Sequence, residues 1–468
     1  FGEEITMALL RASEIAAAAG GTVLQGDRGA VFSSFGLDSR TIERGGLFFA
    51  LVAGRDGHDF VPDAAARGAA GAVVSRGVPA ADKSFVLIKT ADTAAALQDL
   101  ARSVLVRHPA KVVGVTGSVG KTTTKEFIAA LLGTIFRVHK SEGNLNNHLG
   151  LSLSVLRLET EHEVAVLEMG MSAAGEIRRL TGIAPPDVAV VTNVAPVHLA
   201  FFESLQAVAE AKAEILEGLK PDGTAVLNAD DPWSKTLADR APGRVITFGF
   251  SQDAEVRASG MAYAGYDGLQ FRLHYDGAAR EVTLPFLTGG QVENFLAALG
   301  VAAAFGLGWE TLKPALAVLA PAAKRGNIIR LARGITVIDD TYNSNPRALD
   351  MALRSYINLP AGRWVAVLGD MLELGPEGDQ YHEDAGRTAG RLGWDIVAAV
   401  GPAARRIAAG ARAEGLDAAR TPEFASSEEA AAKLPALLKA DDLVLVKGSR
   451  GVRMERIVER LTALMKEN

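Results

Sequence analysis

The stretch GVTGSVGKTTTKE, residues 114–126, decides the fold around it. It follows the apolar residues Val112 and Val113 and leads into a helical pattern, which predicts a strand, a glycine-rich turn and a helix. Glycines allow such a turn to curl tightly, so that backbone N–H groups and the helix N-terminus face phosphate oxygens. Lys121 would reach the β- and γ-phosphates of a nucleotide, and the Thr122 hydroxyl would hold Mg²⁺.

This loop is a variant of the common phosphate-binding pattern. A strict G-x-x-x-x-G-K-T sequence needs glycine at position 115, where this chain has Val115 followed by Thr116 and Gly117. The residues expected to contact nucleotide phosphates are Gly117, Ser118, Val119, Gly120, Lys121, Thr122 and Thr123. The context of strand, loop and helix still predicts a nucleotide site, but it leaves kinases, GTPases, ATPases and ligases open.

Length and composition favour a multidomain enzyme. The chain has 468 residues, more than one core needs, and its 48% hydrophobic and 22% charged residues are typical of a globular protein. A net charge of −6 argues against a broad nucleic-acid-binding face, and no apolar run is long enough to span a membrane. Without cysteine the chain can form neither a disulfide nor a thiolate metal site. We expect a cytoplasmic monomer whose natural start is Met7, with residues 1–6 as an extension.

Three successive blocks of sequence predict an α/β protein with three domains. Residues 1–90 hold short strand-like runs around turns, residues 91–324 alternate apolar runs with helical segments, and the alternation restarts over residues 325–468. Short apolar runs of this kind are typical of buried parallel strands, whose carboxyl ends gather ligands. We therefore predict a small N-terminal α/β domain, a central doubly wound P-loop ATPase domain and a C-terminal Rossmann-like α/β domain.

Polar residues follow the strands next to the phosphate loop. Glu168 ends the run EVAVLEMG, and His198 lies just after the run PDVAVVTNV. A carboxylate and an imidazole beside phosphates suggest a second metal position. The segment EGNLNNHLG (142–150) adds amide side chains that suit a polar ligand or, alternatively, only a turn. Its asparagines are Asn144, Asn146 and Asn147.

These motifs together resemble the Mur ligases, ATP-dependent enzymes that form amide bonds in peptidoglycan synthesis and so serve cell-wall growth, cell shape and cell division. In the central block the resemblance rests on GSVGKTT, GNLNNHLG, Glu168, TNVAPVHL and AKAEI. DSRTIERGGLFFALVAGRDGHDF (38–60) is similar to the module that holds the UDP end of the substrate, and GGQVENFLAALG (289–300) to a segment near adenine. The segments most similar to the member that adds D-alanyl-D-alanine to UDP-N-acetylmuramoyl-tripeptide are DDTYNSNPRAL (339–349), VLGDMLELG (367–375) and VKGSRGVRMERI (446–457).

The resemblance implies a ligase that works through an acyl phosphate, made by attack of the tripeptide carboxylate on ATP. The implied catalytic residues are Lys121, Glu168, His198 and Lys212, and two Mg²⁺ sites are implied, with Thr122 at one and Glu168, His198 and Lys212 at the other. Further implied ATP contacts are Asn294, Arg325, Asp340, Tyr342 and Asn343. The implied substrate contacts are Ser39, Arg40, Gly57 and His58 toward the UDP end, with Asn144, Asn146, Asn147, Lys447, Ser449 and Arg450 elsewhere.

Lys212 has two contrasting readings. It lies in EAKAEIL (210–216), within the amphipathic helix predicted over Glu203–Lys220, where a lysine usually faces solvent. The resemblance implies instead that CO₂ carbamylates this lysine, which would give it an anionic oxygen of the kind Mg²⁺ prefers.

Some features leave alternatives open. AKRGN (323–327) differs from the family's usual order of glycine then arginine, and we match Arg325 to that arginine. The run Asn345-Pro346-Arg347 is similar to the amino-acid selector of the diaminopimelate-adding Mur ligase, although its context favours the dipeptide-adding member. A folylpolyglutamate synthase would lack the N-terminal uridine module, and a nucleotide-switched binding module would not need the metal ligands. Because the phosphate loop and KGSRG fall in different domains, we also expect open and closed states.

Overall fold

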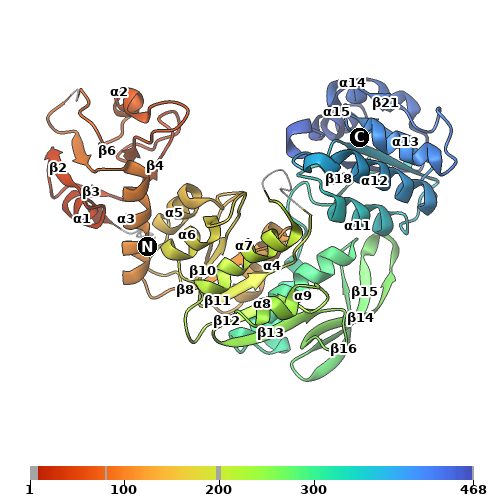
Figure 1. The fold of residues 1–468 in the computed structure, drawn as a ribbon, viewed down its shortest axis with the longest axis horizontal. Helices are drawn as coiled ribbons and strands as arrows, with labels where there is room; N and C mark the ends of the chain where they lie inside the picture. The colour runs from red at the N-terminus through yellow and green to blue at the C-terminus, as the bar shows by residue number, and fades with distance from the viewer. Residues whose placement is uncertain (1–8, 80–81, 197–201, 466–468) are drawn as a thin grey trace.

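The computed structural model describes residues 9–79, 82–196 and 202–465, and three large sheets divide this part of the chain. Figure 1 shows the N-terminal and C-terminal lobes at opposite ends of a central lobe. Each large sheet falls inside one of the three predicted ranges, and the α/β class is confirmed. The domain boundaries at residues 90/91 and 324/325 stay predictions.

The N-terminal lobe is built on a small mixed sheet. Its strands are arranged in the order β2 (Thr22–Gln25), β7 (Val86–Lys89), β6 (Gly71–Val74), β5 (Leu47–Phe49) and β4 (Phe35–Gly36). All pairs are parallel except β2 with β7, and β1 (Leu10–Arg11) pairs separately with β3 (Val31–Phe32). Helices α1 (Ala12–Ala18) and α2 (Val61–Ala66) complete this lobe.

The central sheet is doubly wound around the strand that enters the phosphate loop. That strand, β8 (Lys111–Thr116), has β10 (Val164–Glu168) and β9 (Val138–Lys140) on one side. On its other side lie β11 (Val188–Val191), β12 (Thr224–Asn228) and β13 (Arg244–Gly249), all of them parallel. Successive residues of β8 face opposite sides of the sheet, as in any strand. Val112 accordingly packs in one hydrophobic cluster and Val113 in another. Buried on both faces, these strands read as the continuous apolar runs seen in the sequence.

Helices cover both faces of the central sheet. One cluster includes residues of α3 (Thr93–Arg107), α5 (His148–Leu156), α6 (Glu176–Ile183) and α7 (Leu205–Glu217). The other includes residues of α4 (Lys121–Leu132) and α9 (Gly289–Ala304). Two short helices lie on opposite faces, because Leu237 of α8 (Ser234–Ala238) packs in the first cluster and Leu312 of α10 (Trp309–Leu312) packs in the second. In the residues that the structure describes, no helix has the length and apolar character needed to cross a membrane.

The sequence analysis missed an antiparallel extension of this sheet. After β14 (Val256–Tyr263), which runs parallel to β13, the strands β15 (Leu269–Tyr275) and β16 (Ala278–Leu284) turn back on one another. Asp276 and Gly277 both have positive φ, 57° and 70°, which is the two-residue turn favoured in hairpins. Along β15 buried and exposed residues alternate, a pattern typical of a strand with one solvated face.

The C-terminal lobe repeats the doubly wound plan. Its strands are arranged in the order β17 (Asn327–Arg330), β18 (Thr336–Asp340), β22 (Asp442–Lys447), β19 (Arg363–Gly369), β20 (Ile396–Val400) and β21 (Glu423–Phe424). Only β17 is antiparallel to its neighbour. Its helices are α11 (Pro346–Tyr356), α12 (Gly378–Leu392), α13 (Arg405–Ala413), α14 (Ser427–Lys433) and α15 (Glu455–Met465).

Candidate active site

The phosphate loop is bound by its own lysine, Lys121. Gly117 and Gly120 have φ of +144° and +92°, and the Lys121 ammonium donates a 2.7 Å hydrogen bond to the Gly117 carbonyl. A Cβ added at Gly117 would lie 1.8 Å from Thr192 Oγ1, so this position accepts only glycine without rearrangement. Burial lowers the pKa of Lys121, while Glu168 opposes that shift and Arg325 adds to it.

A second segment holds the phosphate loop from the side of β11. Thr192 Oγ1 donates to the Val119 carbonyl at 2.6 Å, and Asn193 Oδ1 accepts from the Val119 amide at 3.0 Å. Ser118 Oγ donates to the Ala195 carbonyl at 3.0 Å. Residues 192–195 therefore fix the shape of the loop, a role that the sequence analysis did not assign to them.

Glu168 and Thr122 place two oxygens together beside the loop. Thr122 Oγ1 donates to Glu168 Oε2 at 2.8 Å, and Asn146 Nδ2 donates to Glu168 Oε1 at 3.0 Å. The Glu168 amide is itself bound by Ser141 Oγ at 2.9 Å. A hydroxyl and a carboxylate oxygen are ligands that Mg²⁺ prefers, so Thr122 fits one of the two predicted Mg²⁺ sites and Glu168 fits the other.

The other asparagines of the EGNLNNHLG segment have different environments. Asn144 lines the same cavity as Asn146, whereas Asn147 Oδ1 accepts from the Gly150 amide at 2.8 Å and caps helix α5. An N-cap side chain satisfies an amide that the helix leaves free. The role of Asn147 in the structure is therefore to begin α5, and its predicted contact with substrate stays a prediction.

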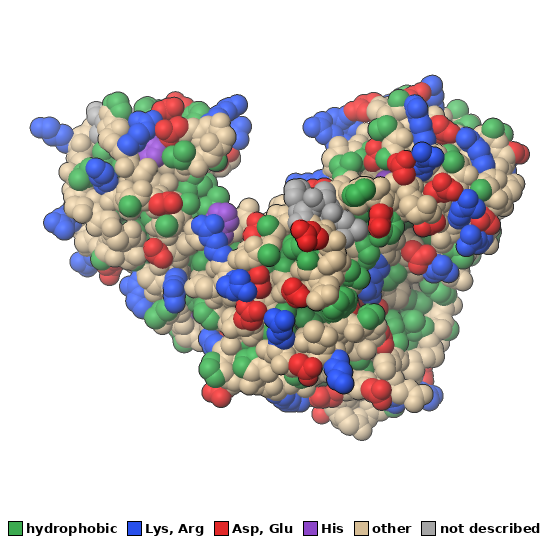
Figure 2. Space-filling view, viewed as in Figure 1, with side chains coloured by type: hydrophobic (Ala, Val, Ile, Leu, Met, Phe, Trp, Pro, Cys, Tyr) green, Lys and Arg blue, Asp and Glu red, His purple; other side chains and the backbone are tan. Residues whose placement is uncertain are grey.

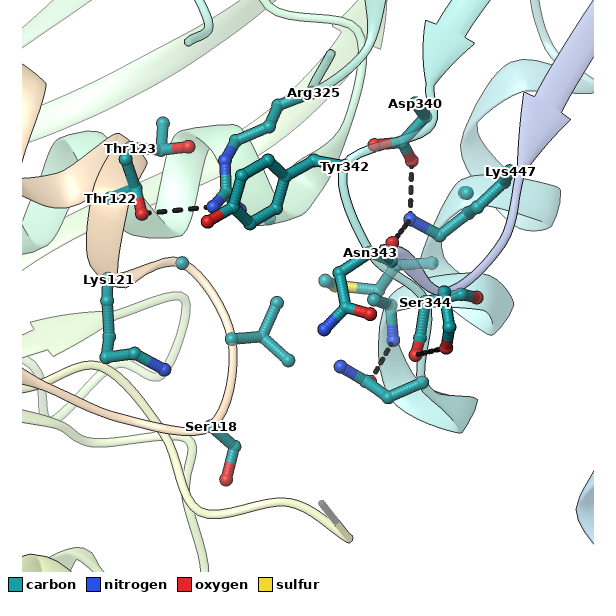
Figure 3. A pocket seen from close by; sticks show the side chains of 18 of the residues that line it. Ser118, Lys121, Thr122, Thr123, Arg325, Asp340, Tyr342, Asn343, Ser344 and Lys447 are labelled. Carbon is teal, nitrogen blue, oxygen red and sulfur yellow. Dashed lines mark hydrogen bonds and ion pairs between the residues drawn. The ribbon is translucent and has the colours of Figure 1, made fainter. Parts of the chain in front are cut away.

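The C-terminal lobe supplies the wall that faces the phosphate loop. Figure 3 shows the Arg325 guanidinium against the Tyr342 ring, 4.0 Å from its centroid, with a 3.0 Å hydrogen bond from Arg325 Nη2 to Thr122 Oγ1. Asp340 and Lys447 are register partners on β18 and β22, and their side chains form a 2.8 Å ion pair. Burial raises the pKa of Asp340, although Lys447 and Arg325 oppose this shift.

These two walls enclose a cavity of about 520 Å³. It contains most of the residues predicted to bind ATP or the peptide ends. Those that line it are Ser118, Val119, Gly120, Lys121, Thr122, Thr123, Asn144, Asn146, Glu168, Asn294, Arg325, Asp340, Tyr342, Asn343, Lys447, Ser449 and Arg450. The central and C-terminal lobes therefore already meet in this structure, although separated states were expected as well.

The residues predicted for the UDP end lie in the N-terminal lobe, away from this cavity. Figure 2 shows a broad notch between the N-terminal and C-terminal lobes, with the central lobe as its floor. Arg40 is exposed and pairs with Asp38 at 2.7 Å, and Ser39 is buried.

His58 is held by its own lobe. His58 Nε2 accepts from the Ser75 amide at 2.8 Å, and Nδ1 lies 2.6 Å from Asp56 Oδ1. Hydrogen bonding to His58 helps to lower the pKa of Asp56 to about 2. A Cβ at Gly57 would lie 2.5 Å from the Leu51 carbonyl, so glycine is needed for this close turn. Both residues shape the loop, while their contact with substrate stays a prediction.

Of the two remaining predicted metal ligands, the structure describes Lys212 but not His198. His198 lies outside the described residues. Lys212 lies on α7, where Ser204 caps the helix, and is only 2% exposed. The reading of Lys212 as a solvent-exposed lysine is therefore wrong. Burial lowers its pKa well below the usual value, and the charge of Lys121 lowers it further.

Sequence reasoning missed Glu293 as part of the cavity wall. It precedes the predicted Asn294 on α9, and burial raises the pKa of its carboxyl. A charged residue on an otherwise apolar helical run was the available signal. Asn294 itself is anchored by a 3.2 Å hydrogen bond from Thr124 Oγ1.

Comparisons with known proteins cover the whole of this site. The family model for the Mur ligase middle domain matches residues 115–302, and the model for the Mur ligase glutamate ligase domain matches residues 324–450. A UDP-N-acetylmuramoyl-tripeptide–D-alanyl-D-alanine ligase of Bacillus subtilis is 36% identical over 426 residues, which are 91% of this chain and 92% of that protein.

Solved structures agree with this match. A crystal structure of MurF from Acinetobacter baumannii has a TM-score of 0.89 at 30% identity, covering 98% of this chain and 99% of that chain. MurF ligase from Thermotoga maritima in complex with ADP has a TM-score of 0.82 at 32% identity, covering 92% and 97%. The similarity thus extends through all three lobes and both walls of the cavity. The chain belongs to the Mur ligase family.

Proposed function

We propose that this chain is an ATP-dependent ligase that adds D-alanyl-D-alanine to UDP-N-acetylmuramoyl-tripeptide. The observation that carries the proposal is one cavity lined both by the phosphate loop and by the Asp340–Lys447 strand ends. The named relative of Bacillus subtilis supports the choice of substrates, and the ADP complex of the Thermotoga maritima protein supports the nucleotide. A cytoplasmic location and a monomeric state stay predictions.

A carboxylate does not condense with an amine in water, because its oxygen is a poor leaving group. In the proposed reaction the tripeptide carboxylate attacks the γ-phosphorus of ATP, the bond from that phosphorus to the bridging oxygen breaks, and ADP leaves. Lys121 and the loop amides would face the oxygens on which charge develops. Enzymes of this kind act mainly by position and charge, and the cavity between the two lobes would supply both.

The amine of D-alanyl-D-alanine would then attack the acyl carbon. The tetrahedral oxyanion collapses, phosphate leaves with the electrons of its C–O bond, and the nitrogen gives up a proton. Lys447, Ser449 and Arg450 lie on the wall where carboxylates of the peptide substrates would bind. Bound Mg²⁺ would supply charge neutralisation at the phosphates. Of the described residues, Thr122 would hold one ion, and Glu168 and Lys212 would hold the other.

We also propose that Lys212 carries a carbamate. The neutral amine would attack CO₂, forming an N–C bond and losing a proton to solvent. Burial supports this proposal, since it favours the neutral amine that the reaction needs.

The identity of the amine is tested by ADP release. We expect turnover with UDP-N-acetylmuramoyl-tripeptide, ATP and D-alanyl-D-alanine together, and only background release when any one of them is omitted. Single amino acids should not replace the dipeptide, because the C-terminal motifs match the dipeptide-adding member. Equal or faster turnover with meso-diaminopimelate and a UDP-dipeptide substrate would favour the alternative Mur ligase. ADP release that needs no amine at all would favour a nucleotide-switched binding module.

Arg450 is expected to act on the peptide end rather than on ATP. It is exposed, lies in the cavity wall, and belongs to the C-terminal lobe. Arg450→Lys keeps the charge but loses the two parallel hydrogen bonds that a guanidinium makes with a carboxylate. The lost bond to a charged group should cost about tenfold or more in kcat/KM for the peptide substrates, with KM for ATP changed less. Full activity of Arg450→Lys would show that no paired contact is made.

A further inference from the structure

Arg347 connects the C-terminal lobe to the central lobe. It lies in the first turn of α11, and its guanidinium is directed at two carboxylates of the central lobe. Nη1 lies 4.0 Å from Asp231 Oδ2, and Nη2 lies 3.5 Å from Glu293 Oε2. The two carboxylate side chains are 2% and 12% exposed, so solvent screens these contacts much less than a surface ion pair.

This placement differs from that of an amino-acid selector. Ser344, Asn345 and Ala348 around it line the catalytic cavity, and Arg347 is not among the described residues that do so. The Arg347 guanidinium instead lies beside a cluster of three carboxylates, those of Asp230, Asp231 and Glu293, and its positive charge offsets their negative charge. Burial and the two aspartates raise the pKa of Glu293, and Arg347 is the charge that opposes them.

Asp231 links Arg347 to the backbone of the central lobe. Its Oδ2 accepts a 2.6 Å hydrogen bond from the Val194 amide, and its Oδ1 accepts a 2.9 Å bond from the Trp233 amide. Val194 lies between Asn193 and Ala195, which bind Val119 and Ser118 of the phosphate loop. Only one carboxylate and one short backbone segment therefore separate Arg347 from the loop.

We propose that Arg347 is a positioning residue that couples docking of the C-terminal lobe to the shape of the phosphate loop. When the lobe is docked, the guanidinium holds Asp231, and Asp231 holds residues 192–195 against the loop. When the lobe moves away, Asp231 loses its interlobe partner and the segment loses this restraint. The inference rests on the nucleotide site of the proposed function, but it does not depend on which amine is used.

The test compares two arginines of the same helix. Arg354 pairs with Asp350 within α11 at 2.9 Å and is 59% exposed, so Arg354→Ala removes an arginine without touching the interface. We expect Arg347→Ala to weaken Mg·ADP binding, measured by calorimetry, by about tenfold, a usual size for coupling between sites. KM for ATP should rise in parallel, while Arg354→Ala stays within twofold of wild type. Failure of ligase activity with every amine would leave this binding result unaffected.

A double variant distinguishes the proposed coupling through Asp231 from a purely structural role of Arg347. If Arg347 only neutralises Glu293, then Arg347→Ala combined with Glu293→Gln should recover the Mg·ADP affinity of Glu293→Gln alone. If Arg347 acts through Asp231, the double variant should stay about tenfold weaker than Glu293→Gln. Recovery, or a change below twofold in Arg347→Ala, would overturn the proposal. If Arg347→Ala does not fold, Arg347→Lys is judged by the same twofold criterion, because lysine cannot span both carboxylates.

Discussion

Replacing Lys121 with alanine is expected to lower kcat by on the order of 10²–10³, the usual loss for one preorganised group that stabilises transition-state charge. The side chain is half-buried and its ammonium points into the loop, where it already binds the Gly117 carbonyl. In the complex it would face the oxygens of the phosphate that is transferred. The measurement is steady-state ADP release at saturating ATP and peptide substrates.

Two comparisons make the result specific to the loop. Lys111→Ala removes an exposed lysine at the start of the strand that leads into the loop, and should leave kcat unchanged. Binding of the UDP substrate should change little in Lys121→Ala, since its predicted contacts lie in the N-terminal lobe. Near-normal turnover of Lys121→Ala would mean that the loop is not the ATP site.

Lys212→Ala is expected to lose most activity, and a small carboxylate should restore part of it. The proposed carbamate is an anionic oxygen ligand, and truncation would leave a space that formate or acetate can fill. Lys212 is buried on α7 with its amine biased toward the neutral form, which fits a group that must react with CO₂. The measurement is ADP release by Lys212→Ala over a series of formate concentrations.

Lys212→Arg should be inactive and should not respond to formate, because the guanidinium occupies the space. Lys220→Ala is the matched control, since Lys220 follows the same helix but is exposed and paired with Asp187. Labelled ¹³CO₂ should give a carbamate signal in the wild type that Lys212→Ala lacks. Wild-type turnover in Lys212→Ala would remove the metal-ligand role of this residue and leave the ligase assignment intact.

The sequence by itself determined the phosphate loop and the three α/β blocks. Each is a local signal: glycines with an adjacent Lys-Thr, and apolar runs that a buried parallel strand requires on both faces. It also placed Glu168 at a strand end, while Asp340 and Lys447 were implied by the family resemblance. In the structure all three end parallel strands, which bring such ends to one edge of their sheet. The antiparallel extension β15–β16 was missed, although its Asp276-Gly277 turn was visible in the sequence.

The tertiary structure decided which polar residues face the cavity and which serve the fold. Asn146 reaches Glu168, whereas its neighbour Asn147 caps a helix. Lys212 lies in a helix whose sequence suggests an exposed lysine, but it is buried. Arg347 contacts a carboxylate of the central lobe and does not line the cavity. Burial and partner choice depend on which elements pack together, and those contacts join residues far apart in the chain. Local spacing therefore identifies the residue types of a site, while only packing determines their charge state and their neighbours.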